Sequence, residues 1–535
     1  MLHTLTTRHG TSWRRGTVLC LGLAMLTLLA GPAWAQSVLR FVPQADLKNT
    51  DPIWTTAAVT ETHAWMIYDQ LFAEDANFKI QPQMVDTWNV SKDQLTWTFT
   101  LRPGLRFHDG DAVTSRDVVA SIKRWGTRDT MAIKLMAVVD SVNAVNDRTF
   151  SIKLKRPYPL VLETLGKPSA NELFIMKEEY AGKVDGFTQI KANIGSGPFR
   201  MIESEWVPGN KVVYEKFKDY KPRSEPPSQY AGSKQVNVDR VEWIYIPDQA
   251  TAMAALQRGE VDVLDKPDFD LAKVMEKDSG IKVEKIPLTF QGYMALNNLW
   301  PPFDNQKARE AMLYLVDQQE YMQAIIGQER YYLPFCGALF ICGTPNATDV
   351  GSEKLKAHDP AKAKELLKEA GYTGYPIVVM DPTDFPVLHA AALVTTQKLR
   401  EIGVNVDLQA MDWSTLTSRR AEKKDPKAGG WNIFHTWWTH PNLLRPVSHI
   451  GVSGDCDKAW FGWPCDKKLQ DLTREWTFEG DAGKRMQLVK EIQLEAYSYV
   501  PYVPFGQWQA PFAFSAKLNN MMITPSVTFW RVSKP

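Results

Sequence analysis

The chain has 535 residues, of which 44% are hydrophobic and 23% are charged, and its formal net charge at pH 7 is +1. This is the composition of a folded globular protein, so it excludes a largely disordered chain. The length allows about three domains. A near-neutral chain has no excess of basic residues with which to bind nucleic acid, so we expect no nucleic-acid partner.

The N-terminus has the features of an export signal. The basic pair Arg14-Arg15 is followed by an apolar run at 18–30, and residues 33–35 read Ala-Trp-Ala, a small-x-small cleavage site. The run is shorter than the roughly 20 helical residues that span a bilayer. We therefore expect a signal peptide, cleaved after Ala35, and a periplasmic mature protein. The arginine pair leaves both Sec and twin-arginine export open.

In chain order, strand patterns alternate with helix patterns. Residues 95–101 alternate apolar and polar side chains, and a helix follows with a capping-box pair, Thr114 and Asp117. Asp359-Pro360 is a helix start, Gly371 is placed to end that helix, and 377–380 is a buried strand. This alternation predicts α/β layers. Further strands are expected at 38–42, 149–154 and 261–264, and a helix at 250–256.

Four cysteines follow the signal and form two local pairs. Cys336 and Cys342 are 6 positions apart, and Cys456 and Cys465 are 9 positions apart. In an exported protein this spacing predicts two disulfides, one within each pair. Neither pair has the spacing of a zinc ribbon.

No catalytic motif is found: the chain lacks G-x-S-x-G, a Walker lysine loop, H-E-x-x-H and G-x-G-x-x-G. Since a missing motif does not exclude catalysis, a secreted hydrolase stays an alternative. His435, His440 and His449 fall within 15 residues, and imidazole clusters bind transition metals. The other interpretation is that these side chains are polar groups satisfied by ordinary hydrogen bonds.

Several stretches in the same order resemble the family-5 solute-binding proteins of ABC importers, the peptide, nickel and opine class. The most specific runs from Trp88 to Trp125 and contains Phe107-His108-Asp109-Gly110. The others are Ile67-Tyr68-Asp69-Gln70-Leu71-Phe72, Ile194-Gly195-Ser196-Gly197-Pro198-Phe199, Pro302-Phe303-Asp304-Asn305, and Asp359-Pro360-Ala361-Lys362-Ala363 with Ala370-Gly371-Tyr372. The resemblance spans nearly all of residues 36–535.

The resemblance implies an α/β, two-lobed periplasmic-binding-protein fold (type II, cluster C-like) with an extra domain inserted in lobe one. Two chain crossings would form a hinge, and the lobes would close on a ligand in the cleft between them. Lobe one would comprise 36–75, 194–288 and 506–535, the inserted domain 76–193, and lobe two 289–505.

The function that the resemblance implies is capture of a small solute, peptide-like, opine-like or glycosidic, for delivery to the permease of an ABC transporter. We expect a monomer with no enzymatic activity and no cofactor. The alternatives are a secreted hydrolase, a periplasmic chaperone, and a metal- or metal-chelate-binding protein acting through His435 and His440.

The expected ligand-binding residues lie in two stretches. Trp413 belongs to a segment that matches the family's cleft lining, and Arg420 is a candidate partner for a ligand carboxylate, although it equally fits a solvated helix arginine. The second stretch is a strand and its end, with aromatic side chains that could stack on flat ligand faces. It contributes His435, Trp437, Trp438, His440 and Asn442. Because side chains alternate along a strand, one of the two tryptophans is expected in the core.

Peptide-binding relatives carry an Asp shortly after the Trp that ends this strand, and that carboxylate pairs with the peptide's α-amine. Here no acid occurs between Asp425 and Asp455. We therefore expect that unmodified peptides are not preferred, and that amine-blocked, glycosidic or opine-like solutes fit better.

Overall fold

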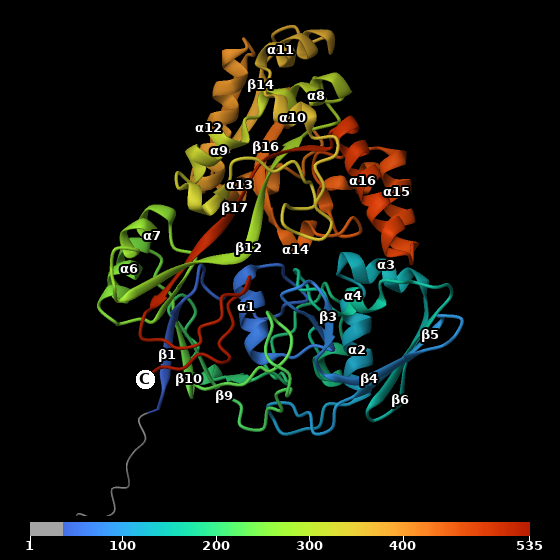
Figure 1. Cartoon of the computed structure of the whole chain (residues 1–535), viewed down its shortest axis with the longest axis vertical. Coiled ribbons are helices and arrows are strands. Elements are labelled where there is room, and N and C mark those ends of the chain that lie inside the picture. The colour runs from blue at the N-terminus through green and yellow to red at the C-terminus, as the bar shows by residue number, and fades with distance from the viewer. Residues whose placement is uncertain (1–35) are drawn as a thin grey trace, which may run out of the picture.

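The computed structural model describes residues 36–535, so the predicted signal peptide lies outside the described residues. The described chain forms two lobes, which two long strands connect (Figure 1). These strands, β12 (Ile281–Leu296) and β17 (Tyr502–Ser515), pair with each other and run from one lobe into the other. The predicted two-lobed α/β fold is thus what the chain adopts.

The sheet of the first lobe is built around β1 (Val38–Val42), which pairs in parallel with β10 (Arg240–Ile244) and β11 (Val263–Asp265). The sheet continues antiparallel through β9 (Lys211–Lys216) to β8 (Phe199–Met201). On the other side β11 pairs with β17. The helices of this lobe are α1 (Ala58–Ile67), α6 (Gln249–Gln257) and α7 (Phe269–Met275).

A separate antiparallel sheet is formed between residues 85 and 154, in the order β4-β5-β7-β6. Helix α2 (Ser115–Trp125) begins with the predicted capping box, in which the side chains of Thr114 and Asp117 each bond to the other residue's backbone. The remaining elements of this part are β2 (Phe72–Glu74), β3 (Ile80–Pro82), β4 (Val85–Val90), β5 (Thr96–Leu101), α3 (Thr130–Val138), β6 (Val139–Asn146), β7 (Thr149–Leu154), α4 (Val161–Gly166) and α5 (Glu178–Ala181).

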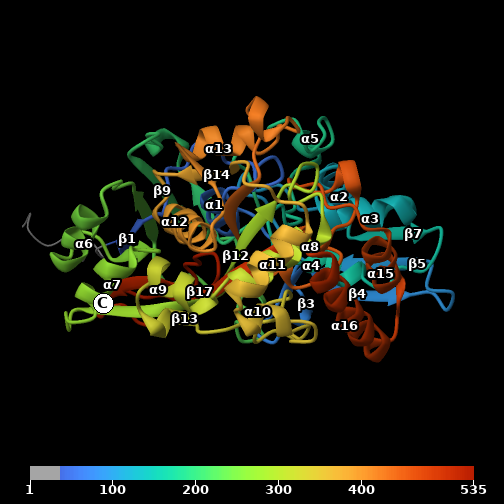
Figure 2. The same ribbon diagram turned by 90° about the horizontal axis from the view of Figure 1, so that it is seen from above.

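In the second lobe β14 (Ile377–Pro382) pairs in parallel with β15 (Val406–Met411) and β16 (Ile433–Thr439), and β16 pairs antiparallel with β12. Seen from above, α9 and α12 lie to one side of β12 and α15 and α16 to the other (Figure 2). The other elements of this lobe are α8 (Gln306–Leu315), α9 (Gln318–Ile325), β13 (Tyr332–Leu333), α10 (Glu353–Ala357), α11 (Pro360–Glu369), α12 (Pro386–Glu401), α13 (Trp413–Arg419), α14 (His440–Leu443), α15 (Lys467–Phe478) and α16 (Ala482–Tyr499).

The start of α11 follows the sequence prediction. The Asp359 side chain accepts a hydrogen bond from the Lys362 N–H, and Pro360 occupies the first turn, where no amide donor is needed. Just beyond the helix Gly371 has φ of 87°, a left-handed conformation that glycine adopts without steric cost.

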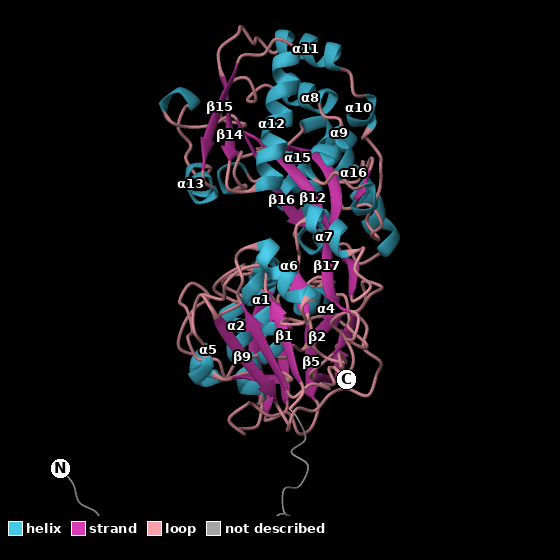
Figure 3. Ribbon diagram, turned by 90° about the vertical axis from the view of Figure 1, so that its left-hand side faces the viewer, coloured by secondary structure: helices cyan, strands magenta, loops and turns pink. Residues whose placement is uncertain are grey.

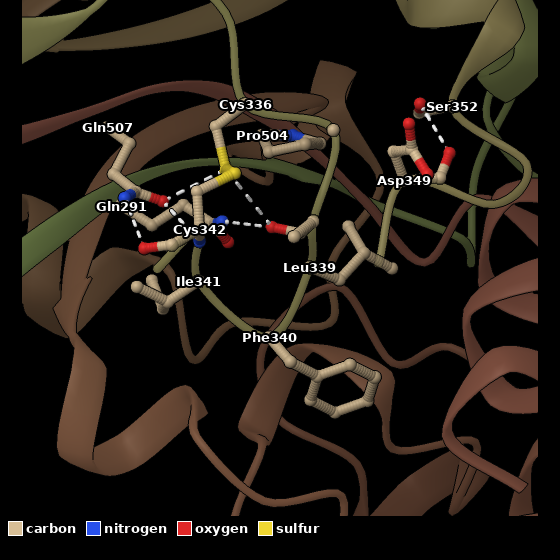
Figure 4. Close-up of a disulfide and its surroundings, with 12 residues drawn as sticks. Gln291, Cys336, Leu339, Phe340, Ile341, Cys342, Asp349, Ser352, Pro504 and Gln507 are labelled. Carbon is tan, nitrogen blue, oxygen red and sulfur yellow. Dashed lines mark hydrogen bonds between the residues drawn. A yellow bond between two sulfur atoms is a disulfide. The ribbon is translucent and has the colours of Figure 1, made fainter. Parts of the chain in front are cut away.

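Both predicted disulfides are present, Cys336–Cys342 and Cys456–Cys465. The first lies beside Gln507 of β17 (Figure 4). The Gln507 side chain accepts a hydrogen bond from the Cys342 N–H (3.0 Å) and donates one to the Cys342 carbonyl oxygen (3.2 Å). This small loop is therefore attached to the strand that connects the lobes. Within residues 36–535 no helix is long and apolar enough to cross a membrane.

Candidate functional site

A cavity of about 1980 Å³ is lined by residues of both lobes. In the first lobe its lining comes from α1 and from the starts of α6 and α7. In the second lobe the lining comes from the end of β16 and from the segments 446–450 and 458–461. Residues 128–138 and 167–171 add a third side. Figure 3 shows the two lobes in side view, with α7 and β17 between them.

Aromatic side chains form the wall that the second lobe contributes. Trp437 lies edge-on to Phe290, with ring centroids 4.9 Å apart, and Trp438 lies edge-on to Trp460 at 5.5 Å. All four rings line the cavity. The expectation that one of the two adjacent tryptophans belongs to the core does not hold, because β16 ends at the cavity and both of its faces reach the cavity there.

Trp413 and Arg420 lie behind this wall and outside the cavity lining. The Arg420 guanidinium lies over the rings of Trp413 (5.6 Å), Trp460 (5.3 Å) and Phe461 (4.9 Å). It has no carboxylate partner among the described residues, and burial lowers its pKa to about 10. The structure thus places Arg420 against two cavity-lining rings, whereas the sequence left open a contact with a ligand carboxylate and a solvated helix arginine.

His435 is fully buried in the second lobe, and it does not line the cavity. Its Nε2 hydrogen-bonds with the Thr395 hydroxyl (2.7 Å), and its ring packs against Phe505. Burial lowers its pKa to about 3, so the ring is neutral at pH 7. The structure therefore gives His435 no place on the cavity wall: β16 is buried on both faces from Ile433 to Thr436, and its side chains reach the cavity only from Trp437 onward.

The other two histidines are also neutral, since burial lowers both pKa values to about 4. His449 lines the cavity, accepts from the Gly451 N–H (3.0 Å) and donates to the Leu339 carbonyl oxygen (3.0 Å), so both ring nitrogens are occupied. His440 is 5% exposed and accepts from the Thr289 N–H (3.3 Å). Among residues 36–535 no three His, Cys, Asp or Glu side chains are grouped to hold a metal ion. The metal alternative through His435 and His440 gains no support from this geometry.

Asn442 lines the cavity, as expected. Its side-chain amide donates to the Thr439 hydroxyl (2.8 Å), and its carbonyl oxygen has no hydrogen-bond partner among the described residues. It is a neutral polar group next to the two tryptophans.

Charged side chains are divided between two sides of the cavity. Cations lie on and around α3 and α15, where the Arg156 guanidinium is 3.8 Å from the centre of the Phe478 ring. Carboxylates lie on the starts of α6 and α7, on the opposite side of α1 in Figure 1. The lining cations on the first side are Arg128, Lys134, Arg156, Lys167, Lys458 and Arg474, against the carboxylates Asp129 and Asp455. The lining carboxylates on the second side are Asp248, Asp268 and Asp270, against the single cation Lys266. The cavity therefore has a basic side and an acidic side.

Sequence reasoning missed one group in the first lobe. Glu61 of α1 lines the cavity and accepts a hydrogen bond from the Ser526 hydroxyl. The carboxyl of Glu172, 1% exposed, lies within hydrogen-bonding reach of it. These three residues are far apart in the chain, so no local pattern could have indicated that they meet.

Two lobes that together line a large cavity have the geometry of a protein that encloses a solute. A model of the bacterial extracellular solute-binding proteins, family 5, middle region, matches residues 79–454, and the chain belongs to this family. Its role is that of a substrate-binding protein which serves an ABC transporter.

Three similar proteins illustrate the match. A probable peptide ABC transporter periplasmic-binding protein, y4tO of Sinorhizobium fredii, is 38% identical, over 91% of this chain and 92% of its own length. The glutathione-binding protein GsiB of Pectobacterium atrosepticum is 29% identical, over 94% and 95%. The structure of AgaA from A. tumefaciens R10, in complex with agropinic acid, aligns with a TM-score of 0.75 at 21% identity and covers 93% of this chain and 99% of its own.

Proposed function

We propose that this protein captures a peptide-like organic solute that carries a carboxylate, and delivers it chemically unchanged to a membrane permease. The observation that carries the proposal is the cavity lined from both lobes, with an aromatic wall and a basic side. A solute in contact with both lobes favours their closed arrangement, because only that arrangement provides both sets of contacts.

The size and chemistry of the cavity support an elongated solute. Its volume of about 1980 Å³ exceeds the roughly 300–1,000 Å³ of pockets for drug-sized ligands. The indole faces of Trp437 and Trp438 suit flat or apolar parts of a solute. Arg128, Lys134 and Arg156 have no carboxylate partner among the described residues, so they are available to a solute carboxylate. The names of two relatives, peptide-binding and glutathione-binding, agree with this class.

An opine-like or glycosidic solute is the second candidate. The complex of the related AgaA contains agropinic acid, and a tryptophan wall also stacks on sugar faces. Both classes use the same aromatic wall, so identification of the solute separates them.

The identity and fate of the solute test this proposal. Protein purified from a periplasmic fraction is denatured, and the released small molecules are identified by mass spectrometry. The same solute is then incubated with refolded protein and recovered. We expect an unaltered peptide-like molecule. Recovery of a cleaved or otherwise altered molecule would support the secreted hydrolase instead, and broad recovery of unfolded chains would support a chaperone.

We propose further that the protein is exported to the periplasm, is cleaved after Ala35 and acts there as a monomer. The basic, apolar and Ala-Trp-Ala segments of residues 1–35 support export, as do periplasmic relatives. The intact mass of the periplasmic protein should correspond to a chain that begins at Gln36. A mass that includes residues 1–35 would contradict this assignment.

A further inference from the structure

Two carboxyl groups meet at the wall of the cavity in the first lobe. The half-buried Glu61 on α1 faces the cavity, and Glu172 lies behind it with 1% of its surface exposed. Neither oxygen of Glu172 has a hydrogen-bond donor among the described residues. Because a carboxylate only accepts hydrogen bonds, the contact between the two groups requires a proton or a cation.

The chain holds Glu172 in this position. The preceding residue, Asn171, has φ of 60°, a conformation that asparagine tolerates better than most residues. Its side-chain amide donates to the carbonyl oxygens of Pro52, Ile53 and Thr55, at 2.9–3.1 Å. Glu172 is thereby held against the segment that leads into α1, and it cannot turn to solvent without loss of these bonds.

The nearby lysines do not neutralise the pair. Lys167 is bonded to Asp129 (2.7 Å) and to the Ser169 hydroxyl (2.6 Å). Lys266 is bonded to Asp265 (2.9 Å). Each lysine thus has a carboxylate partner of its own. The buried Glu172 and the half-buried Glu61 therefore lack a compensating cation at a surface that a solute reaches, although the Ser526 hydroxyl donates a hydrogen bond to Glu61.

We propose that Glu61 and Glu172 form a binding subsite for a protonated amine of the solute. This proposal rests on the proposed function and names one group of its solute. An ammonium group has three N–H donors, enough to bond Glu61 and to supply the missing cation. The subsite lies on the first lobe, so the amine partner does not have to follow β16. It replaces the expectation that solutes with a free amine are disfavoured.

Proton linkage follows from the same geometry. Burial is the main cause that raises the pKa of Glu61 and that of Glu172. The Ser526 hydroxyl and Lys266 act against the shift of Glu61, and Lys167 acts against that of Glu172. Without solute the pair therefore retains a proton at a pH where an exposed glutamate is ionised. The solute's ammonium takes the place of that proton, so binding should release protons.

The first experiment uses n-propylammonium chloride as the probe, at about 0.1 M, against sodium chloride of equal ionic strength, with the melting temperature as readout. The probe should raise the melting temperature of the wild-type chain by about 2 °C or more. Glu61→Gln and Glu172→Gln should remove most of this rise. The exposed Glu179→Gln is the matched control and should respond as the wild type does. An equal response in Glu61→Gln, or none in the wild type, would overturn the proposal.

A second measurement needs no probe. Since the folded pKa values are raised, the native state binds protons more tightly than the unfolded one, and this stabilisation is lost as pH rises above about 4.5. Glu172→Gln should flatten the fall of the melting temperature between pH 5 and pH 8, and should melt above the wild type at pH 8. A lower melting temperature for Glu172→Gln than for the wild type at pH 8 would contradict the inference that Glu61 and Glu172 lack a compensating cation. Neither result depends on whether the solute is altered, so failure here is distinct from failure of the proposed function.

Discussion

At the scale of single residues, a substitution of Trp438 tests whether the solute contacts the aromatic wall of the cavity. Its indole lines the cavity next to Trp460, and its Nε1 has no hydrogen-bond partner among the described residues. Trp438→Ala should weaken binding of the recovered solute by about 10- to 100-fold, because it removes a large apolar contact. Titration calorimetry measures the loss.

Trp88→Ala is the control for that substitution. Trp88 is 40% exposed on β4 and lies outside the cavity lining, so solute affinity should not change. Similar affinities for Trp438→Ala and the wild type would show that the solute does not contact this wall.

The sequence predicted residue types at the site better than residue roles. The segment around Trp437 and Trp438 could be found because a strand and its end are local patterns. The burial of His435 and the position of Arg420 behind Trp460 depend on how distant segments pack, so the sequence could not settle either. Glu61 and Glu172 meet through tertiary packing alone.

At the scale of elements, the disulfide Cys456–Cys465 closes a loop that carries Lys458, Trp460 and Phe461 to the cavity. Replacement of both cysteines by alanine should lower the free energy of unfolding by about 2–3 kcal/mol on the chain-entropy model. It should also weaken solute binding, because the loop that carries the lining residues is then no longer closed by a covalent bond. Urea denaturation and calorimetry measure the two effects.

The disulfide Cys336–Cys342 provides a matched comparison. It closes a loop of similar length, and neither of its cysteines lines the cavity. Alanine at both positions should cost about 2 kcal/mol of stability with little change in affinity. Equal losses of affinity in the two double variants would mean that the 456–465 loop has no particular role at the cavity.

Elements that begin with strong local signals were predicted correctly. The capping pair Thr114 and Asp117 and the Asp359-Pro360 start satisfy backbone donors within a few residues, so the sequence determines them locally. The sheet order, in which β17 from the end of the chain lies between β11 and β12, depends on long-range pairing. No local pattern in the sequence indicates this order, so it was not predicted.

At the scale of the whole molecule, a buried ion pair joins the lobes. Glu74 of β2 pairs with Arg445 of the second lobe, and both side chains are almost fully buried. Glu74→Gln leaves Arg445 without its partner in the closed arrangement, whereas water solvates it when the lobes separate. We expect a larger radius of gyration without solute and about 10-fold weaker solute binding.

Glu260→Gln is the control, since Glu260 pairs with Arg258 on the exposed surface of one lobe. It should leave the radius and the affinity unchanged. A Glu74→Gln variant with the wild-type radius would show that this pair does not bias closure.

The central claim is that the two lobes close around an unaltered solute in this cavity. Small-angle scattering of the wild-type protein, stripped of solute and then saturated with the recovered molecule, tests it most directly. The account predicts that the radius of gyration falls on saturation, and that it returns to its first value when the intact solute is removed. Tight binding with no change in the radius, or removal of a chemically altered solute, would contradict it.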